Sequence, residues 1–441
     1  MKGKETPMNW VIKIEGERLQ MCPSQEAEIW KRRSIYRVPE HAKALNKKAY
    51  EPLTVAFGPY HHNDKHLMPM EEHKKRALLH FLKRTNKHLQ EFVKPLEEVV
   101  LELMDSYDKL DEECRDRERF LQMMVLDGCF LLEILHTTKE IPEDYAKNDP
   151  IFSKQGMYCI MPYIRRDMLM IENQIPLLVL EKLEAVVKGT TDVPIVKGTT
   201  KDDKQSLNSL ILKFCTANWE ATKEMGTPGL HVLDVYRKSM LGPCKIGPNQ
   251  SQKTPSKIMR SAMELREGGI HFRKSNTNSL KDIDFENCGT LKLPAITIDD
   301  ATEHTFLNLM AFERLHNGVD QPAVTSYVFF MDNIIDTAKD VHLLRSKGII
   351  NNALGSDDAV AKLFNSITND ITLDPECRLR VLHQNVNLYC TKRRNRWMAN
   401  LRHYYVHNPW AIISIIAAIF LLVIAALQNV YTVLPYYRNN S

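Results

Sequence analysis

The sequence lacks the short motifs that mark the commonest enzyme active sites. Its 441 residues contain no glycine-rich phosphate loop, no Gly-x-Ser-x-Gly turn and no His-Glu-x-x-His pair. Cys-x-x-Cys spacing, typical of zinc and redox sites, is also missing. We therefore expect no cofactor, no metal site and no catalytic residue.

The cysteines do not form a recognisable disulfide framework. There are nine, an odd number, and Cys129 and Cys215 fall inside apolar helical patterns. Reduced thiols that fill a core are typical of proteins facing the cytosol. The pattern favours a cytosolic-facing body, although some pairs among the nine could still form disulfides.

Neither sign of charge is in large excess over most of the chain. The formal net charge is +4, with 59 Lys and Arg residues against 55 Asp and Glu. Six of the basic residues follow residue 390, and no acidic residue does, so residues 1–390 sum to −2 with 53 basic residues against 55 acidic ones. A near-neutral body predicts no nucleic-acid partner.

Long hydrophobic runs are absent except at one place. Residues 1–20 carry charges throughout and hold no signal-peptide core. Residues 410–427 are 18 uncharged residues, which span roughly 27 Å as a helix, near the hydrocarbon thickness of a bilayer. Trp410, Ile416, Phe420 and Leu427 mark the expected membrane anchor. The alternative is a buried core helix, but such helices rarely exclude polar residues over five turns.

The charges around this run predict its orientation. Five basic residues form a basic membrane flank before it, and only Arg438 follows it; the five are Lys392, Arg393, Arg394, Arg396 and Arg402. An excess of Lys and Arg favours the cytoplasmic side, so we expect a single-pass, tail-anchored protein. The sequons at Asn249 and Asn439 leave a lumenal body as the alternative. Small residues at 414, 418 and 425 could pair two spans into a homo-oligomer.

The rest of the chain predicts a mainly α-helical fold. Pro69 with following acidic residues opens one helix, residues 120–135 form a buried central helix, and residues 167–187 form an apolar helix bent at Pro176. Further helices are expected from Asp299, Val324, Ser356 and 374–376. Period-two patterns between residues 270 and 298 predict a small antiparallel three-stranded meander.

These patterns divide the chain into four expected parts. An N-terminal extension (1–24) precedes a helical body (25–408) with polar loops at 188–206 and 242–257. The first loop holds a nine-residue tandem copy of Val-Lys-Gly-Thr-Thr, typical of a tolerated insertion. The membrane helix (409–428) and a short tail (429–441) complete the chain.

Several polar residues interrupt the apolar helices and are the candidates for a polar core. Asp127, Glu133 and Glu172 are carboxylates in such surroundings, where burial could raise a pKa and create a general acid. We favour a structural network in which Asp127, Asn173 and Gln174 satisfy each other and the backbone near Pro176. Residues 61–64 (His-His-Asn-Asp) are the densest set of possible metal ligands, but their spacing favours a solvated loop.

Six ordered segments of the chain are similar to those of a known family. They are residues 35–39 (IYRVP), 57–62 (FGPYHH), 126–133 (LDGCFLLE), 167–176 (DMLMIENQIP), 262–270 (AMELREGGI) and 408–410 (NPW). Together they resemble the plant-specific "domain of unknown function 247" family from about residue 25 to the tail. Two departures are mild: Met170-Ile171 replaces the usual Leu-Leu, and Met259-Arg260 replaces Ile-Pro.

The resemblance implies a plant membrane protein without an accepted enzymatic activity. Some grass relatives are implicated in self-incompatibility, and the family favours the plasma membrane. We therefore expect a membrane-tethered, non-catalytic recognition protein with a lipid bilayer and an unidentified protein as partners. The alternatives are an enzyme that uses buried carboxylates near Asp127 and Glu172, and a cytosolic adaptor with a dispensable tail.

Overall fold

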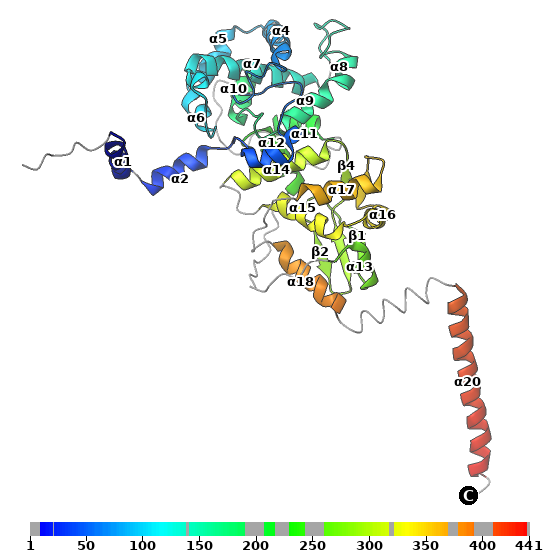
Figure 1. Ribbon diagram of the computed structural model, residues 1–441. Coiled ribbons are helices and arrows are strands. Elements are labelled where there is room, and N and C mark those ends of the chain that lie inside the picture. Colours follow the sequence, from blue (N-terminus) through cyan, green and yellow to red (C-terminus); the bar gives the residue numbers. More distant parts are fainter. Residues whose placement is uncertain are drawn as a thin grey trace, which may run out of the picture. The chain divides into compact units, whose positions relative to one another are not determined.

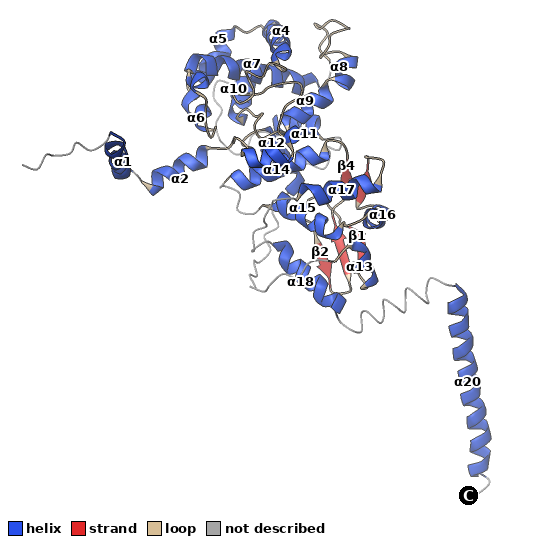
Figure 2. Ribbon diagram, in the orientation of Figure 1, coloured by secondary structure: helices blue, strands red, loops and turns tan. Residues whose placement is uncertain are grey.

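The computed structural model describes nine stretches of the chain, and these confirm a mainly helical fold with small sheets (Figures 1 and 2). The described residues are 9–20, 22–137, 141–189, 207–216, 229–242, 260–316, 322–368, 378–391 and 409–438. The chain divides into two compact units. The first comprises residues 1–247, 278–281 and 298–328, and the second comprises 248–277, 282–297 and 329–441.

The first unit is built from helices. In chain order they are α1 (Asn9–Gln20), α2 (Pro23–Arg32), α3 (Glu40–Leu45), η1 (Lys47–Ala49), α4 (Met68–Thr85), α5 (Leu89–Glu97), α6 (Val100–Asp105), η2 (Glu112–Arg115), α7 (Arg117–Thr137), α8 (Lys154–Cys159), α9 (Met161–Met168), α10 (Leu177–Lys188), α11 (Leu207–Cys215), α12 (Val232–Leu241) and α14 (Thr302–Leu315). Helix α15 (Ala323–Ile334) begins in this unit and ends in the second.

Helix α7 is the centre of the first unit, as predicted. From Met123 to Leu135 it is buried on all sides, because it packs against α4, α5, α10 and α11. Gly128 lets α10 approach, since a Cβ there would lie 2.5 Å from Leu183 Cδ1 and 2.8 Å from Val179 Cγ1. Helix α4 begins with Pro69 in its first turn, also as predicted.

The single bent helix expected over 167–187 is wrong. Helix α9 ends at Met168, residues 169–176 are irregular and buried, and α10 starts only at Leu177. Pro176 disfavours helical geometry at the residue before it. Polar side chains within the stretch then replace the missing helical hydrogen bonds, as described below.

A small sheet is present near 270–298, but its strands do not form the expected antiparallel meander. Strands β1 (His271–Lys274), β2 (Asp284–Glu286) and β3 (Thr290–Leu293) form a sheet of order β1-β3-β2, with β1 parallel and β2 antiparallel to β3. Nine residues separate β1 from β2, enough for the chain to pass β3's position. Strand β3 takes the central place because Leu291 and Leu293 are both fully buried.

The second unit also contains a two-stranded sheet. This sheet pairs β4 (Ile296–Ile298) with β5 (Ile350–Asn352), and the helices are α13 (Ala262–Glu267), α16 (Ala338–Ser346), α17 (Asp357–Ile367) and α18 (Arg378–Thr391). Helix α18 packs on β2 of the first sheet, and α16 contacts β5 and packs on α13 and α17. Asp340 fixes the contact of α16 with α13, because its carboxylate accepts hydrogen bonds from Met263 N (2.8 Å) and Thr337 N (2.9 Å).

The predicted helix starts near Asp299, Val324 and Ser356 are confirmed by α14, α15 and α17. Ser356 caps α17 by accepting a hydrogen bond from Ala359 N. The start expected at 374–376 lies outside the described residues. So do the polar loops 188–206 and 242–257, apart from residues 188, 189 and 242. The expected domain boundaries stay predictions.

The last element, α20 (Pro409–Arg438), is a 30-residue helix. Two described helices, Arg117–Thr137 and Ile413–Tyr431 within α20, are long and apolar enough to cross a membrane. The first is α7, which is mostly buried in protein, whereas no side chain in the span of α20 is buried. Burial therefore assigns α7 to the protein core and leaves α20 as the candidate span.

Candidate functional site

A buried polar core in the first unit brings together most of the residues singled out from the sequence. The irregular stretch 169–176 lies at its centre, and Gln174 supports it from within. The amide of Gln174 donates to the carbonyl oxygens of Met168 (2.6 Å) and Met170 (2.7 Å) and accepts from Leu233 N (3.1 Å). Buried backbone groups need such partners, so one side chain here replaces part of a helix.

Residues 53–64 (segment 53–64) run beside this stretch and are held to it along their backbone. The carboxylate of Asp167 accepts hydrogen bonds from the three consecutive amides of residues 53–55 at 2.6–3.1 Å. Asn173 accepts from Phe57 N at 2.7 Å and donates to Val55 O at 2.9 Å. Burial raises the pKa of Asp167, although these backbone donors oppose the rise. The segment thus has side-chain partners instead of strand neighbours.

Asp127 of α7 and Lys74 of α4 form the deepest charged contact. Lys74 is 0% exposed, and its Nζ lies 2.6 Å from Asp127 Oδ1, Glu71 Oε1 and Ala56 O. The second oxygen of Asp127 accepts from Gly58 N at 2.8 Å. Burial raises the pKa of Asp127, with the Lys74 charge acting against the rise. The pair connects two helices to segment 53–64.

Gly58 is required at the point where segment 53–64 turns. Its φ is +74°, and a Cβ there would lie 2.6 Å from Gln174 O and 2.9 Å from the hydroxyl of Tyr107. Tyr107 donates to that same Gln174 carbonyl at 3.1 Å. Only glycine combines this backbone conformation with so close an approach.

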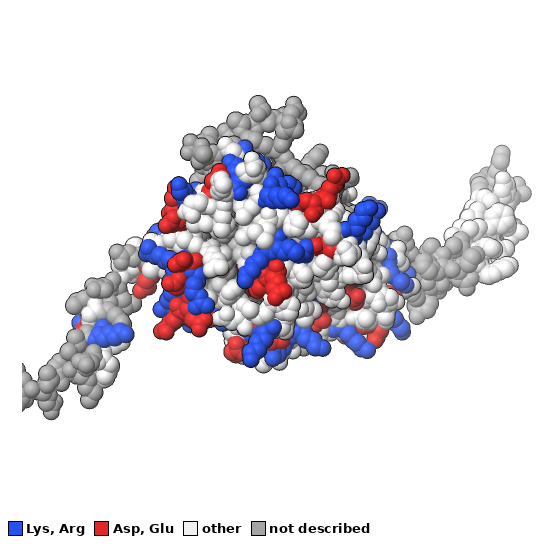
Figure 3. Space-filling view, turned by 90° about the horizontal axis from the view of Figure 1, so that it is seen from above, with Lys and Arg blue, Asp and Glu red and all other residues white. Residues whose placement is uncertain are grey.

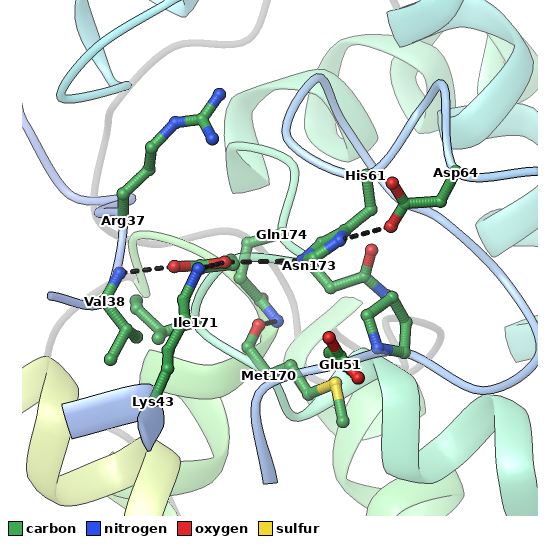
Figure 4. A network of polar contacts seen from close by, with 12 residues as sticks. Arg37, Val38, Lys43, Glu51, His61, Asp64, Met170, Ile171, Asn173 and Gln174 are labelled. Carbon is green, nitrogen blue, oxygen red and sulfur yellow. Dashed lines mark hydrogen bonds and ion pairs between the residues drawn. The ribbon is translucent and has the colours of Figure 1, made fainter. Parts of the chain in front are cut away.

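Glu172 belongs to a second charged cluster, which reaches solvent through Lys43 and Asp64 with 21% and 41% of their side chains exposed. Figure 4 labels the surrounding residues Val38, Lys43, His61 and Asp64. One oxygen of Glu172 accepts from Val38 N; the other lies 2.9 Å from Lys43 Nζ of α3 and 3.4 Å from His61 Nε2. The opposite ring nitrogen of His61 lies 2.8 Å from Asp64 Oδ2. Burial alone would raise the pKa of Glu172, but the hydrogen bonds from His61 and Lys43 outweigh it and lower that pKa.

Glu133, the third candidate carboxylate, lies at the far end of α7. Its Oε1 accepts from Tyr145 Oη at 2.8 Å and from the guanidinium of Arg84. Burial raises its pKa, and Arg84 opposes the rise. The Thr137 hydroxyl donates to the Glu133 carbonyl at 2.6 Å within the helix, whereas the contacts with Arg84 and Tyr145 tie the end of α7 to its surroundings.

The histidines near residues 61–66 do not converge on one point. His61 faces two carboxylates, His66 contacts Pro52 O at 2.9 Å, and His73 lies 3.2 Å from Arg76. In the described part of the chain, no group of three or more His, Cys, Asp or Glu side chains could hold a metal ion.

The expected network of Asp127, Asn173 and Gln174 is right about the nearby backbone, which Asn173 and Gln174 contact, but wrong about mutual hydrogen bonds among the three side chains. Within the described residues, the partners of these three side chains are backbone groups and the Lys74 ammonium. For Asp127 and Asn173 the reason is that segment 53–64 supplies backbone donors that need buried acceptors. Nothing in the local sequence pattern indicates this long-range pairing.

Sequence reasoning also missed two members of the core. Lys74 shares the apolar face of α4 with Met70, Ala77 and Phe81, and a lone charge on such a face is the signal that could have revealed it. Asp167 offered a weaker signal, as an acidic residue before an apolar run. A further buried carboxylate, Glu313 of α14, pairs with Arg237 of α12 at 2.8 Å.

The buried carboxylates of this core contact backbone amides and cations. Asp127 and Glu172 are 1% and 2% exposed, and each contacts both a cation and a backbone amide. Such carboxylates are positioned to stabilise a fixed conformation of segment 53–64. On the outer surface, Figure 3 shows basic and acidic side chains intermingled on the face in view.

The predicted anchor residues lie in α20, and the predicted basic flank lies outside the described residues. Trp410, Ile416, Phe420 and Leu427 are all exposed along the helix, as a lipid-facing surface requires. The five basic residues of the flank fall between residues 392 and 402, so their role stays a prediction.

Comparison with known proteins agrees with the resemblance seen in the sequence. The family model DUF247, described as a plant protein of unknown function, matches residues 35–424. The UPF0481 protein At3g47200 of Arabidopsis thaliana is 31% identical over 438 residues, covering 91% of this chain and 86% of that protein. The putative UPF0481 protein At3g02645 of the same plant is 24% identical over 515 residues, covering 95% and 93%. No solved structure matches. The chain belongs to the DUF247 family of plant proteins of unknown function.

Proposed function

We propose that this protein is a membrane-tethered, non-catalytic recognition protein whose helical body faces the cytoplasm. The observation that carries the proposal is α20, an apolar helix with no buried side chain in its span. In water such a surface is unfavourable, whereas a bilayer satisfies it. Tethering confines the body to a surface and raises its effective concentration for neighbouring proteins.

The dimensions of α20 support a full crossing. Its 30 residues reach roughly 45 Å, the thickness of a bilayer with its headgroups. Trp410 is 78% exposed near one end and Tyr431 is 76% exposed near the other. The two positions are 21 residues apart in the sequence, which corresponds to about 32 Å along a helix, so both rings fall at headgroup depth when the apolar part fills the hydrocarbon.

The polar core supports a non-catalytic role. Asp127 contacts Lys74 and the backbone amide of Gly58, and Glu172 contacts Lys43 and the backbone amide of Val38. These contacts explain the burial of both carboxylates without a reaction. The positive flank before α20 supports the cytoplasmic orientation. A self-incompatibility role would be a special case of recognition, and it rests on the family resemblance alone.

Deletion of residues 409–441 tests the tether. The truncated chain should move from the membrane pellet to the soluble fraction after carbonate extraction, because α20 is removed. Deletion of residues 9–20 is the matched control, since α1 also exposes Trp10 and Ile14 but is too short to span. A truncated chain that still resists carbonate would refute the single anchor.

Recognition is tested by replacing residues 409–441 with an unrelated single-span tail. Affinity purification from plant membranes followed by mass spectrometry should recover the same protein partners from the exchanged chain as from the natural one. Partners that disappear with the exchange would assign recognition to the span and contradict a role for the body.

A further inference from the structure

The ring of His61 is held between two carboxylates that belong to different parts of the first unit. Its Nδ1 lies 2.8 Å from Asp64 Oδ2 on its own segment, and its Nε2 lies 3.4 Å from Glu172 Oε2 on the stretch 169–176. A carboxylate can only accept hydrogen bonds. Neutral imidazole carries one N–H, so it can satisfy one of these contacts and must turn a lone pair toward the other. Only the doubly protonated ring presents an N–H and a positive charge to both carboxylates, through the close contact to Asp64 and the longer ion pair at 3.4 Å to Glu172.

The other charged groups around the ring do not substitute for it. Lys43 of α3 reaches Glu172 at 2.9 Å and Glu40 at 3.7 Å, and Glu51 is paired with Lys47 at 3.1 Å. Tyr50 has a pKa raised to about 12 by burial and by the Glu172 charge, with Arg314 acting against the rise. Lys43 is therefore shared between Glu172 and Glu40, and Asp64 pairs with His61.

We propose that His61 is a proton-operated latch for segment 53–64. With both ring nitrogens protonated it joins Asp64 to Glu172 and holds the end of the segment against the stretch 169–176. Loss of one proton converts one contact from attraction to repulsion and loosens the segment. The proposal does not depend on the membrane tether.

The electrostatics and the accessibility of the site fit this role. Burial disfavours the charged ring, but the interactions with Glu172 and Asp64 outweigh burial and raise the pKa of His61. The latch is therefore fully closed below about pH 6.5 and opens as the pH rises through the raised pKa. The Asp64 side chain contacts His61 Nδ1 and is 41% exposed, which gives protons a route from solvent to this nitrogen.

Hydrogen–deuterium exchange of the full chain in detergent micelles measures the latch directly. Protection of the amides in segment 53–64, corrected for the intrinsic pH dependence of exchange, should decline as the pH rises above about 6.5. His61→Gln keeps one donor and one acceptor but cannot carry charge. At every pH this variant should show the low protection that the wild-type protein shows only at high pH. His66→Gln is the matched control, because His66 lies beside the segment and contacts a carbonyl, and it should retain the wild-type decline.

A second variant keeps the proposal testable if His61→Gln fails to fold. Asp64→Asn removes the half-exposed carboxylate and should shift the decline in protection to lower pH without unfolding the body. A pH-independent wild type, a decline that survives in His61→Gln, or an unchanged midpoint in Asp64→Asn would each overturn the latch.

Discussion

The contact between Asp127 and Lys74 offers the sharpest test of how the polar core stabilises the first unit. Asp127→Leu removes the acceptor of Gly58 N and one of two carboxylates at Lys74 Nζ. A buried N–H left unpaired costs ~1–3 kcal/mol. Breaking one side of a buried ion pair costs ~3–5 kcal/mol, reduced here because Glu71 and Ala56 O remain. We expect a loss of about 3–5 kcal/mol, a large part of a typical net stability of ~5–15 kcal/mol.

Asp127→Asn should have an intermediate effect. The sequence by itself suggests a nearly silent replacement, since asparagine keeps the shape of the side chain. The structure shows two donors, Lys74 Nζ and Gly58 N, that approach different oxygens of the carboxylate. Asparagine has one acceptor oxygen, so one donor loses its partner and the expected cost is ~1–3 kcal/mol.

Because two compact units need not unfold together, the assay must report on the first unit alone. Native-state hydrogen exchange of α7 amides in the full chain gives the free energy of opening for the core that contains Asp127. Asp105→Asn is the control, since this exposed carboxylate pairs with exposed Arg32 and should change stability by less than about 0.5 kcal/mol.

The pairing itself is isolated by combining Lys74→Met with Asp127→Asn. The double variant should lose less than the sum of the single losses, by ~0.5–3 kcal/mol, because each single change leaves a buried partner behind. Equal stability of the Leu, Asn and wild-type chains would refute the role assigned to Asp127. So would strict additivity of the two changes.

Three further expectations follow from other residues. Gly58→Ala should abolish folding of the first unit. Gly128→Ala should destabilise it less, because the added Cβ meets the movable side chains of Leu183 and Val179. Thermal unfolding of the two variants compares their stabilities. Burial lowers the pKa of His231 to about 4, so the first unit should lose up to about 3 kcal/mol as the pH falls from 6.5 to 4. His231→Asn retains a capping side chain for α12 and should flatten that loss in acid titrations. In microsomes, a glycosylation acceptor placed after Arg438 should be modified while Asn249 is not; glycan on Asn249 alone would reverse the topology.

The sequence contained enough to predict the helices whose signals are local. Apolar residues on all sides identified α7, proline and acidic residues identified the start of α4, and the uncharged run identified α20. These signals are reliable because helical hydrogen bonds and caps join residues within one or two turns. The same locality explains why Asp127, Glu172, Asn173 and Gln174 were recognisable as members of a polar core.

Only the tertiary structure decided how those residues are paired. The backbone of segment 53–64 is bound by Asp127 and Asp167, which lie 69 to 114 positions away in the sequence. The central place of β3 likewise depends on its pairing with β1, which precedes it by 19 positions in the register. Residue spacing does not encode such contacts, because many distant backbone donors could satisfy the same buried carboxylate. Packing selects one of them, and for Asp127 and Lys74 it selected the backbone at Gly58 and Ala56.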